Sequence, residues 1–186
     1  MPCAVMIEPI GLVLAGGQSR RMGRDKAALM IGGMSLLDRA KALLAEAGCN
    51  PILVSGAGGL VDRFANAGPL AGLDAALHTL SDGQWVLVIP VDMPNLKPAL
   101  LKKLIQARTD EAGLYFADHP MPVCVRVTSD LRAYLQQTLE APDGDRSLFC
   151  LFRSLGFTAI AGPGRHSPAF WNCNTPEQLA NLELSS

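Results

Sequence analysis

Four cations follow a short apolar strand near the start of the chain. Residues 10–14 read Ile-Gly-Leu-Val-Leu, and three small residues come next, Ala15, Gly16 and Gly17. The cations lie within the loop that follows: Arg20, Arg21, Arg24 and Lys26. Free backbone amides at a strand end hydrogen-bond phosphate oxygens, and glycines let the backbone come close to them. Arg and Lys supply the compensating charge. The stretch therefore predicts a loop that binds the phosphates of a nucleoside triphosphate.

This loop differs from the two commonest phosphate-binding motifs. A P-loop requires four residues between its glycines and then Lys, whereas Gly17 and Gly23 are one residue further apart and Arg24 follows. The dinucleotide pattern G-x-G-x-x-G does not fit either. A glycine-rich surface loop with solvated cations is the structural alternative, and for Arg20, Arg21 and Arg24 the two interpretations stay open.

A carboxylate ends the most apolar segment of the chain. Residues 85–91 read Trp-Val-Leu-Val-Ile-Pro-Val, and Asp92 and Pro94 follow. Such a run is typical of a central, doubly covered strand. A carboxylate at its end suits Mg²⁺, which binds one or two carboxylates, water and phosphate oxygens, and orients an α-phosphate for attack. Lys26 would fold back onto the phosphates and stabilise charge in the transition state. We therefore expect Lys26 and Asp92 to be catalytic, although Asp92 could also simply cap a turn.

Alternating strands and helices must position these residues. Ser35 and Gly48 are typical ends of a helix over residues 36–47, and residues 51–55 predict the next strand. Residues 68–72 are expected to lead into a short helix that carries Leu73, Ala76, Leu77 and Leu80. Another helix is expected over 97–108. The second half predicts strands at 113–117, 121–127 and 157–161 and helices at 131–139 and 147–155. Thr175 and Pro176 predict a last helix start.

This order of elements predicts one α/β domain over residues 1–186, with three layers: a mainly parallel sheet and helices on both faces. Ligands of such sheets bind at the carboxyl ends of the strands, where the glycine loop and Asp92 would meet.

Composition narrows the class of protein. The chain has 186 residues, of which 49% are hydrophobic and 18% charged, with a net charge of -1. These values are typical of a globular domain and argue against general nucleic-acid binding. The five cysteines are odd in number and lack C-x-x-C spacing, which favours reduced thiols over disulfides or zinc. With neither a leader pattern nor a long apolar run, we expect a cytoplasmic protein without membrane contact.

Four segments resemble the molybdenum cofactor guanylyltransferase family. Residues 14–26 match L-A-G-G-x-S-x-R-M-G-x-D-K, residues 68–72 read G-P-L-A-G, residues 90–94 read P-V-D-M-P, and residues 172–176 read N-C-N-T-P. The resemblance spans most of the chain. It implies a nucleotide-diphospho-sugar transferase-like fold and transfer of GMP from GTP to molybdopterin or Mo-molybdopterin, with release of pyrophosphate and Mg²⁺ as cofactor.

The resemblance also implies roles for particular residues. Asp92 would hold the magnesium, and Asp62 would be a further base or metal contact. Asn172 and Asn174 would contact the pterin or a phosphate, unless they only form a turn before the last helix. The nucleotide-binding set would be Leu14, Ala15, Gly16, Gly17, Arg21, Lys26, Asp62, Gly68, Pro69, Leu70, Gly72 and Asp92.

Rival functions stay open at this point. A cytidylyltransferase acting on the same pterin, or a transferase acting on a sugar or another small cofactor, would need the same phosphate loop. A non-catalytic protein that delivers cofactor to apo-enzymes is a rival of another class. In the implied reaction the acceptor phosphate is already ionised, so catalysis would rest on positioning and charge neutralisation rather than on a base. The implied partners are GTP, molybdopterin, and molybdoenzyme apo-proteins or their chaperones.

Overall fold

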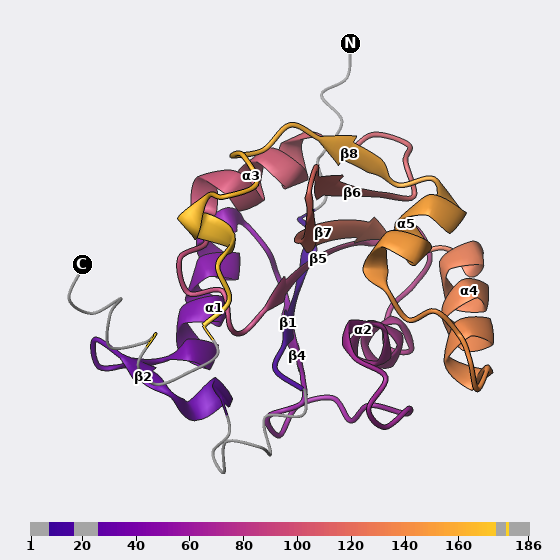
Figure 1. Ribbon diagram of the computed structural model, residues 1–186, viewed down its shortest axis with the longest axis horizontal. Coiled ribbons are helices and arrows are strands. Elements are labelled where there is room, and N and C mark those ends of the chain that lie inside the picture. The colour runs from indigo at the N-terminus through magenta and orange to yellow at the C-terminus, as the bar shows by residue number, and fades with distance from the viewer. Residues whose placement is uncertain (1–7, 17–25, 174–177, 179–186) are drawn as a thin grey trace.

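A six-stranded mixed sheet forms the centre of the computed structural model, which describes residues 8–16, 26–173 and 178 (Figure 1). The strand order is β4-β1-β5-β7-β6-β8. The strands are β1 (Ile10–Leu14), β4 (Ile52–Ser55), β5 (Trp85–Pro90), β6 (Gly113–Phe116), β7 (His119–Arg126) and β8 (Thr158–Ile160). Because β7 pairs antiparallel with both β5 and β6 while the other pairs are parallel, β7 alone among these strands runs in the opposite direction.

The strand register brings three strand ends together. Leu14, the last residue of β1, pairs with Ser55 of β4 on one side and with Pro90 of β5 on the other. The loops that leave these strands therefore begin at one edge of the sheet. This confirms the prediction that the glycine loop and Asp92 start from neighbouring strands.

Helices cover both faces of the sheet, which confirms the predicted three-layer α/β fold. Helices α1 (Leu36–Ala47) and α3 (Pro98–Gln106) lie on one face, and α2 (Pro69–Leu77), α4 (Ser129–Glu140) and α5 (Leu148–Leu155) on the other (Figure 1). Each face has its own apolar core. In β1, Leu12 packs into the cluster with α2, α4 and α5, whereas its neighbour Val13 packs into the cluster with α1 and α3. This alternation is the period of two that a strand imposes.

The predicted helix ends are largely correct. Ser35 caps α1 by accepting a hydrogen bond from the Asp38 amide, and Gly48 ends it in the left-handed conformation, with φ 94°. Thr128 and Ser147 cap α4 and α5 in the same way. The helix expected over 97–108 is shorter at both ends.

Some elements were not predicted. A small hairpin of β2 (Met30–Ile31) and β3 (Met34–Ser35) turns through two glycines, Gly32 and Gly33, both at positive φ. Short 3₁₀ turns occupy Lys26–Ala28 and Pro168–Phe170. The predicted helix start at Thr175 and Pro176 lies outside the described residues.

The cysteines in the described part of the chain are free thiols: Cys49, Cys124, Cys150 and Cys173. Burial raises the pKa of the Cys49 and Cys124 thiols to about 12, so both are protonated at neutral pH. They pack as small apolar residues and are poor nucleophiles. None of the helices in the described residues has the length and apolar character needed to cross a membrane.

Candidate active site

An open cavity of about 560 Å³ lies where β1, β4 and β5 end. Its walls come from the strand ends, the start of α2, the loop after β5 and the segment before the last described residues. The lining residues are Leu14, Ala15, Gly16, Lys26, Ser55, Asp62, Gly68, Pro69, Gly72, Pro90, Val91, Asp92, Met93, Pro120, Met121, Leu148 and Asn172. Cavities at this edge are the usual ligand sites of parallel sheets.

Backbone contacts hold the strand ends in place. The Ala15 amide donates to the Ser55 carbonyl at 2.8 Å, and the Val91 amide donates to the Leu14 carbonyl at 3.0 Å. Beyond these bonds, the loops after β1 and β4 touch through Gly16 and Gly56. A Cβ on Gly56 would lie 2.5 Å from the Gly16 nitrogen, so only glycine permits this approach. The start of the glycine loop is therefore fixed by its neighbours.

Lys26 and Asp92 form an ion pair at the wall of the cavity. The Lys26 Nζ lies 3.6 Å from Asp92 Oδ2, and the two side chains are only 18% and 21% exposed. Lys26 comes from the short turn after the glycine loop, and Asp92 from the loop after β5. One cation and one carboxylate, side by side and partly shielded from water, can bind a phosphate oxygen and a divalent metal respectively.

Asp62 is oriented by its neighbours on the β1–β4 side of the cavity. Ser55 Oγ donates to Asp62 Oδ1 at 2.7 Å, and the other carboxylate oxygen lies against Gly16, 3.3 Å from where a Cβ would be. Gly72 of α2 lies behind this pair. A Cβ there would come within 2.6 Å of Ser55 Oγ and 2.7 Å of Leu14 Cδ2, so the close packing of α2 depends on this glycine.

The segment that carries Asn172 contacts the loop after β5. The Cys173 amide donates to the Asp92 carbonyl at 2.7 Å, and Asn95 donates to the Pro168 carbonyl at 3.3 Å. Asn172 thereby lines the same cavity as Asp92, although the two residues are far apart in sequence. Pro120, Met121 and Leu148 add an apolar wall.

Most of the site residues predicted from the sequence meet in this cavity. Leu70 does not: its side chain is fully buried in the core beneath α2, because a helix turns successive residues to different faces. Gly17, Arg21 and Asn174 lie outside the described residues, as do Arg20 and Arg24. Sequence reasoning missed Ser55, Pro120, Met121 and Leu148, none of which stands in a motif.

The donors around the cavity fit a magnesium ion. The described residues contain no cluster of three or more His, Cys, Asp and Glu side chains, so they offer no complete protein cage for a metal. Magnesium needs none, because it usually binds through one or two carboxylates and takes its other ligands from phosphates and water. Asp92 and Asp62, both lining the cavity, supply oxygen donors of that kind.

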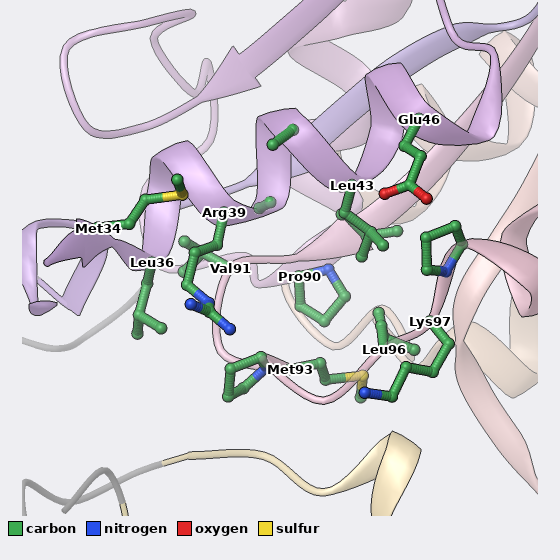
Figure 2. A pocket seen from close by; sticks show the side chains of 15 residues that line it. Met34, Leu36, Arg39, Leu43, Glu46, Pro90, Val91, Met93, Leu96 and Lys97 are labelled. Atoms are coloured by element: carbon green, nitrogen blue, oxygen red, sulfur yellow. The ribbon is translucent and has the colours of Figure 1, made fainter. Parts of the chain in front are cut away.

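A second cavity, of about 280 Å³, lies between α1 and the segment after β5 (Figure 2). Figure 2 shows the side chains of Arg39 and Lys97 beside Met93, with Leu36 and Leu43 on the α1 side. Pro90, Val91 and Met93 line both cavities. None of the nucleotide-binding residues predicted from the sequence, among those that the structure describes, lines this second cavity, so the first one is the candidate active site.

Known proteins resemble this chain over most of its length. The family model described as MobA-like NTP transferase domain matches residues 11–159. The molybdenum cofactor guanylyltransferase of Xanthomonas euvesicatoria pv. vesicatoria is 39% identical over 176 residues, covering 92% of this chain and 93% of its own. A probable molybdenum cofactor guanylyltransferase of Opitutus terrae is 34% identical, covering 90% and 91%.

Solved structures share the fold. Molybdopterin-guanine dinucleotide biosynthesis protein A from Archaeoglobus fulgidus superposes with a TM-score of 0.68 at 19% identity, covering 94% of this chain and 97% of its own. The 2-C-methyl-D-erythritol 4-phosphate cytidylyltransferase of Thermus thermophilus gives 0.66 at 20% identity, covering 96% and 98%. The predicted nucleotide-diphospho-sugar transferase fold is thereby confirmed. By its family match and by these relatives, the chain belongs to the MobA-like nucleotidyltransferases of the molybdenum cofactor guanylyltransferase family.

Proposed function

We propose that this protein transfers GMP from GTP to the terminal phosphate of molybdopterin or Mo-molybdopterin and releases pyrophosphate. One observation carries the proposal: Lys26 and Asp92 lie 3.6 Å apart in a cavity at the ends of β1 and β5. A carboxylate and a cation so placed suit a triphosphate that carries Mg²⁺, because the carboxylate would bind the metal and the cation the phosphate oxygens. The relatives named molybdenum cofactor guanylyltransferase support the choice of donor and acceptor.

The nucleotide would lie along the β1–β4 side of the cavity. Ala15 and Gly16 offer backbone close to the phosphates, and Gly68 and Pro69 border the far wall at the start of α2. The Asp62 carboxylate, which accepts a hydrogen bond from Ser55, would offer a hydrogen-bond acceptor to the nucleoside. A carboxylate accepts hydrogen bonds from N–H groups, and guanine presents such donors on its pairing edge.

The reaction would be a substitution at the α-phosphorus. An oxygen of the acceptor phosphate forms the new P–O bond, the bond to the bridging oxygen breaks, and pyrophosphate leaves with that electron pair. The acceptor is ionised at neutral pH, so no side chain has to remove a proton. Lys26 would bind the α-phosphoryl oxygens and stabilise the charge that they gain in the transition state.

Asp92 would hold Mg²⁺, which supplies charge neutralisation and in-line orientation of the triphosphate when it is bound. The ion pair with Lys26 keeps the Asp92 carboxylate directed into the cavity without nucleotide. When substrate enters, each partner would exchange the other for a ligand of opposite charge. This exchange leaves neither charge uncompensated in a partly shielded site.

The acceptor would occupy the opposite side of the cavity. Asn172 can both donate and accept hydrogen bonds there, and Pro120 and Met121 offer apolar surface for a flat ring. This placement brings the acceptor phosphate towards Asp92, because the Asn172 segment is bonded to the Asp92 backbone through Cys173.

A thermal shift experiment tests the donor. Wild-type protein is heated with GTP, CTP, ATP or UTP, each with and without Mg²⁺. A nucleotide at about 100 times its Kd adds about 2.7 kcal/mol, which raises Tm by roughly 5–10 °C for a domain of this size. The proposal expects a magnesium-dependent rise with GTP. A rise with CTP alone would contradict GTP as donor and indicate a cytidylyltransferase.

A transfer assay tests the reaction itself. Protein, GTP, Mg²⁺ and molybdopterin should release pyrophosphate and form the guanine dinucleotide, and chelation of the metal should stop both. Binding of GTP without pyrophosphate release in the presence of acceptor would overturn the proposed catalysis and favour a cofactor-delivery protein. A cytoplasmic location, and hand-over of the product to molybdoenzyme apo-proteins or their chaperones, belong to the same proposal.

A further inference from the structure

Helix α2 contains one charged residue, and that residue is buried. The helix reads Pro-Leu-Ala-Gly-Leu-Asp-Ala-Ala-Leu, and every residue from Leu70 to Leu77 is buried. The Asp74 side chain is only 5% exposed. A buried carboxylate costs stability unless charges or hydrogen bonds compensate it, and an apolar side chain of similar size is often the more stable choice. Packing alone therefore does not account for an aspartate at this position.

The carboxylate of Asp74 is compensated from the loop before α2. Arg63 Nη1 lies 3.6 Å from Asp74 Oδ2, an oxygen that accepts no hydrogen bond in the described part of the chain. Arg63 also contacts the imidazole of His78, whose Nδ1 lies 3.7 Å from Asp74 Oδ1. The guanidinium is further placed over the Phe64 ring, 5.4 Å from its centroid. Arg63 is thus held against α2 by charge, while Phe64, which packs against the core cluster that includes α2, supports the guanidinium from within the loop.

Arg63 directly follows Asp62, which lines the candidate active site. Asp62 accepts a hydrogen bond from Ser55 at the end of β4, while Arg63 pairs with Asp74 on α2. The two neighbouring side chains anchor the same short stretch of backbone to two different elements. Leu60, two residues before Asp62, is bonded to β4 through its backbone, so that side of the stretch is already fixed. On the other side, release of the α2 anchor would remove the Arg63 contact, and the 2.7 Å bond from Ser55 to the Asp62 carboxylate would remain.

We propose that Asp74 is a positioning residue for nucleotide binding, which acts through Arg63 to hold Asp62 at the cavity. It touches no substrate. It fixes the backbone from which Asp62 extends, so that the carboxylate is preorganised for a donor group of the nucleoside. This inference rests on the proposed use of the cavity for a nucleoside triphosphate, but not on the identity of the base.

The test measures the Kd of nucleotide by calorimetry for three single variants, Asp74→Asn, Arg63→Met and Asp62→Asn. It also measures the two double variants that combine Asp62→Asn with one of the other two changes. The nucleotide is whichever triphosphate the wild type binds most tightly. Asp74→Asn and Arg63→Met should each raise Kd about tenfold, within the range of coupling between residues in one network. In the Asp62→Asn background neither change should raise Kd further. A purely structural role would not produce that loss of effect.

Two further variants serve as controls, one that keeps the charge of Arg63 and one that removes an unrelated carboxylate. Arg63 is 43% exposed, so Arg63→Met keeps the proposal testable even if Asp74→Asn does not fold. Arg63→Lys, which retains a cation, should recover most of the affinity. Asp110→Asn is the matched control, because Asp110 is an exposed aspartate that pairs with Arg126 and lines neither cavity.

The inference would be overturned if Arg63→Met bound nucleotide within twofold of the wild type. It would equally be overturned if Asp74→Asn weakened binding by the same factor with and without Asp62. Both results presuppose a wild type that binds a triphosphate. A wild type that binds none would refute the proposed function instead, so the two failures are distinguishable.

Discussion

Replacement of Lys26 by Met tests the centre of the proposed mechanism. Met has a similar length but no charge, so the change removes the cation and keeps most of the packing. The ammonium is expected to stabilise charge on the α-phosphoryl oxygens, and loss of one such donor typically costs about 2.7–4 kcal/mol in the transition state. We therefore expect kcat/KM for GTP to fall about 10²–10³-fold.

The stability of the protein should change less. Lys26 and Asp92 lie 3.6 Å apart with 18% and 21% of their side chains exposed, so water still reaches the carboxylate that remains. An exposed pair contributes about 1 kcal/mol or less and breaking a fully buried pair costs about 3–5 kcal/mol, so loss of this partly shielded pair should cost about 1–2 kcal/mol. The Tm of Lys26→Met should accordingly fall by roughly 2–8 °C. The loss in transition-state stabilisation would still exceed the loss in stability.

The assay is pyrophosphate release at saturating acceptor and varied GTP, next to a thermal melt of the same samples. Lys102→Met is the matched control, because Lys102 is exposed on α3 and lines neither cavity. Lys26→Arg, which keeps the charge, should retain more activity than Lys26→Met. A Lys26→Met enzyme within about threefold of wild-type kcat/KM would refute the role assigned to this ammonium.

Three further predictions address the metal, the packing of α2 and the thiols. Asp92→Asn should make the thermal shift with GTP independent of Mg²⁺, because the carboxylate that would hold the ion is gone. An unchanged magnesium effect would show that other residues hold the metal. Gly72→Val should lower the free energy of unfolding by about 1–3 kcal/mol through overpacking, seen in urea titrations, and weaken GTP binding because Ser55 must move. Cys124, whose pKa is raised to about 12 by burial, should resist thiol reagents at pH 8 in native protein and react once urea unfolds it; rapid labelling of the folded protein would argue against the burial seen here.

The strands and helices that carry the site follow closely from local sequence signals. Ser35 and Gly48 bound α1 because a hydroxyl cap and a left-handed glycine each satisfy free backbone groups. The apolar run before Asp92 predicts a central strand, and β5 is that strand. Its side chains are apolar on both sides because both faces of the sheet are covered there. These signals depend on a few adjacent residues, so a single sequence is enough to detect them.

Other parts of the site depend on how the elements pack against one another. Leu70 stands in the same short motif as Gly68 and Pro69, yet its side chain points into the core rather than into the cavity. A motif gives the sequence positions, whereas the helix geometry decides which of them face the ligand. Met121 and Leu148 join the cavity wall from β7 and α5, and no local pattern links them to β1.

Asp74 illustrates a signal that sequence reading passes over. An aspartate within an otherwise apolar helix reads as a solvated position until the burial of the whole helix is known. Once α2 is seen to be covered on all sides, the carboxylate requires a partner, and Arg63 is the residue that supplies the charge. Arg63 directly follows Asp62 in the chain. The ion pair that compensates the buried Asp74 carboxylate therefore also fixes the backbone that orients Asp62 towards the nucleotide. A change on the hidden face of α2 should therefore affect binding in the cavity, without any contact between Asp74 and the ligand.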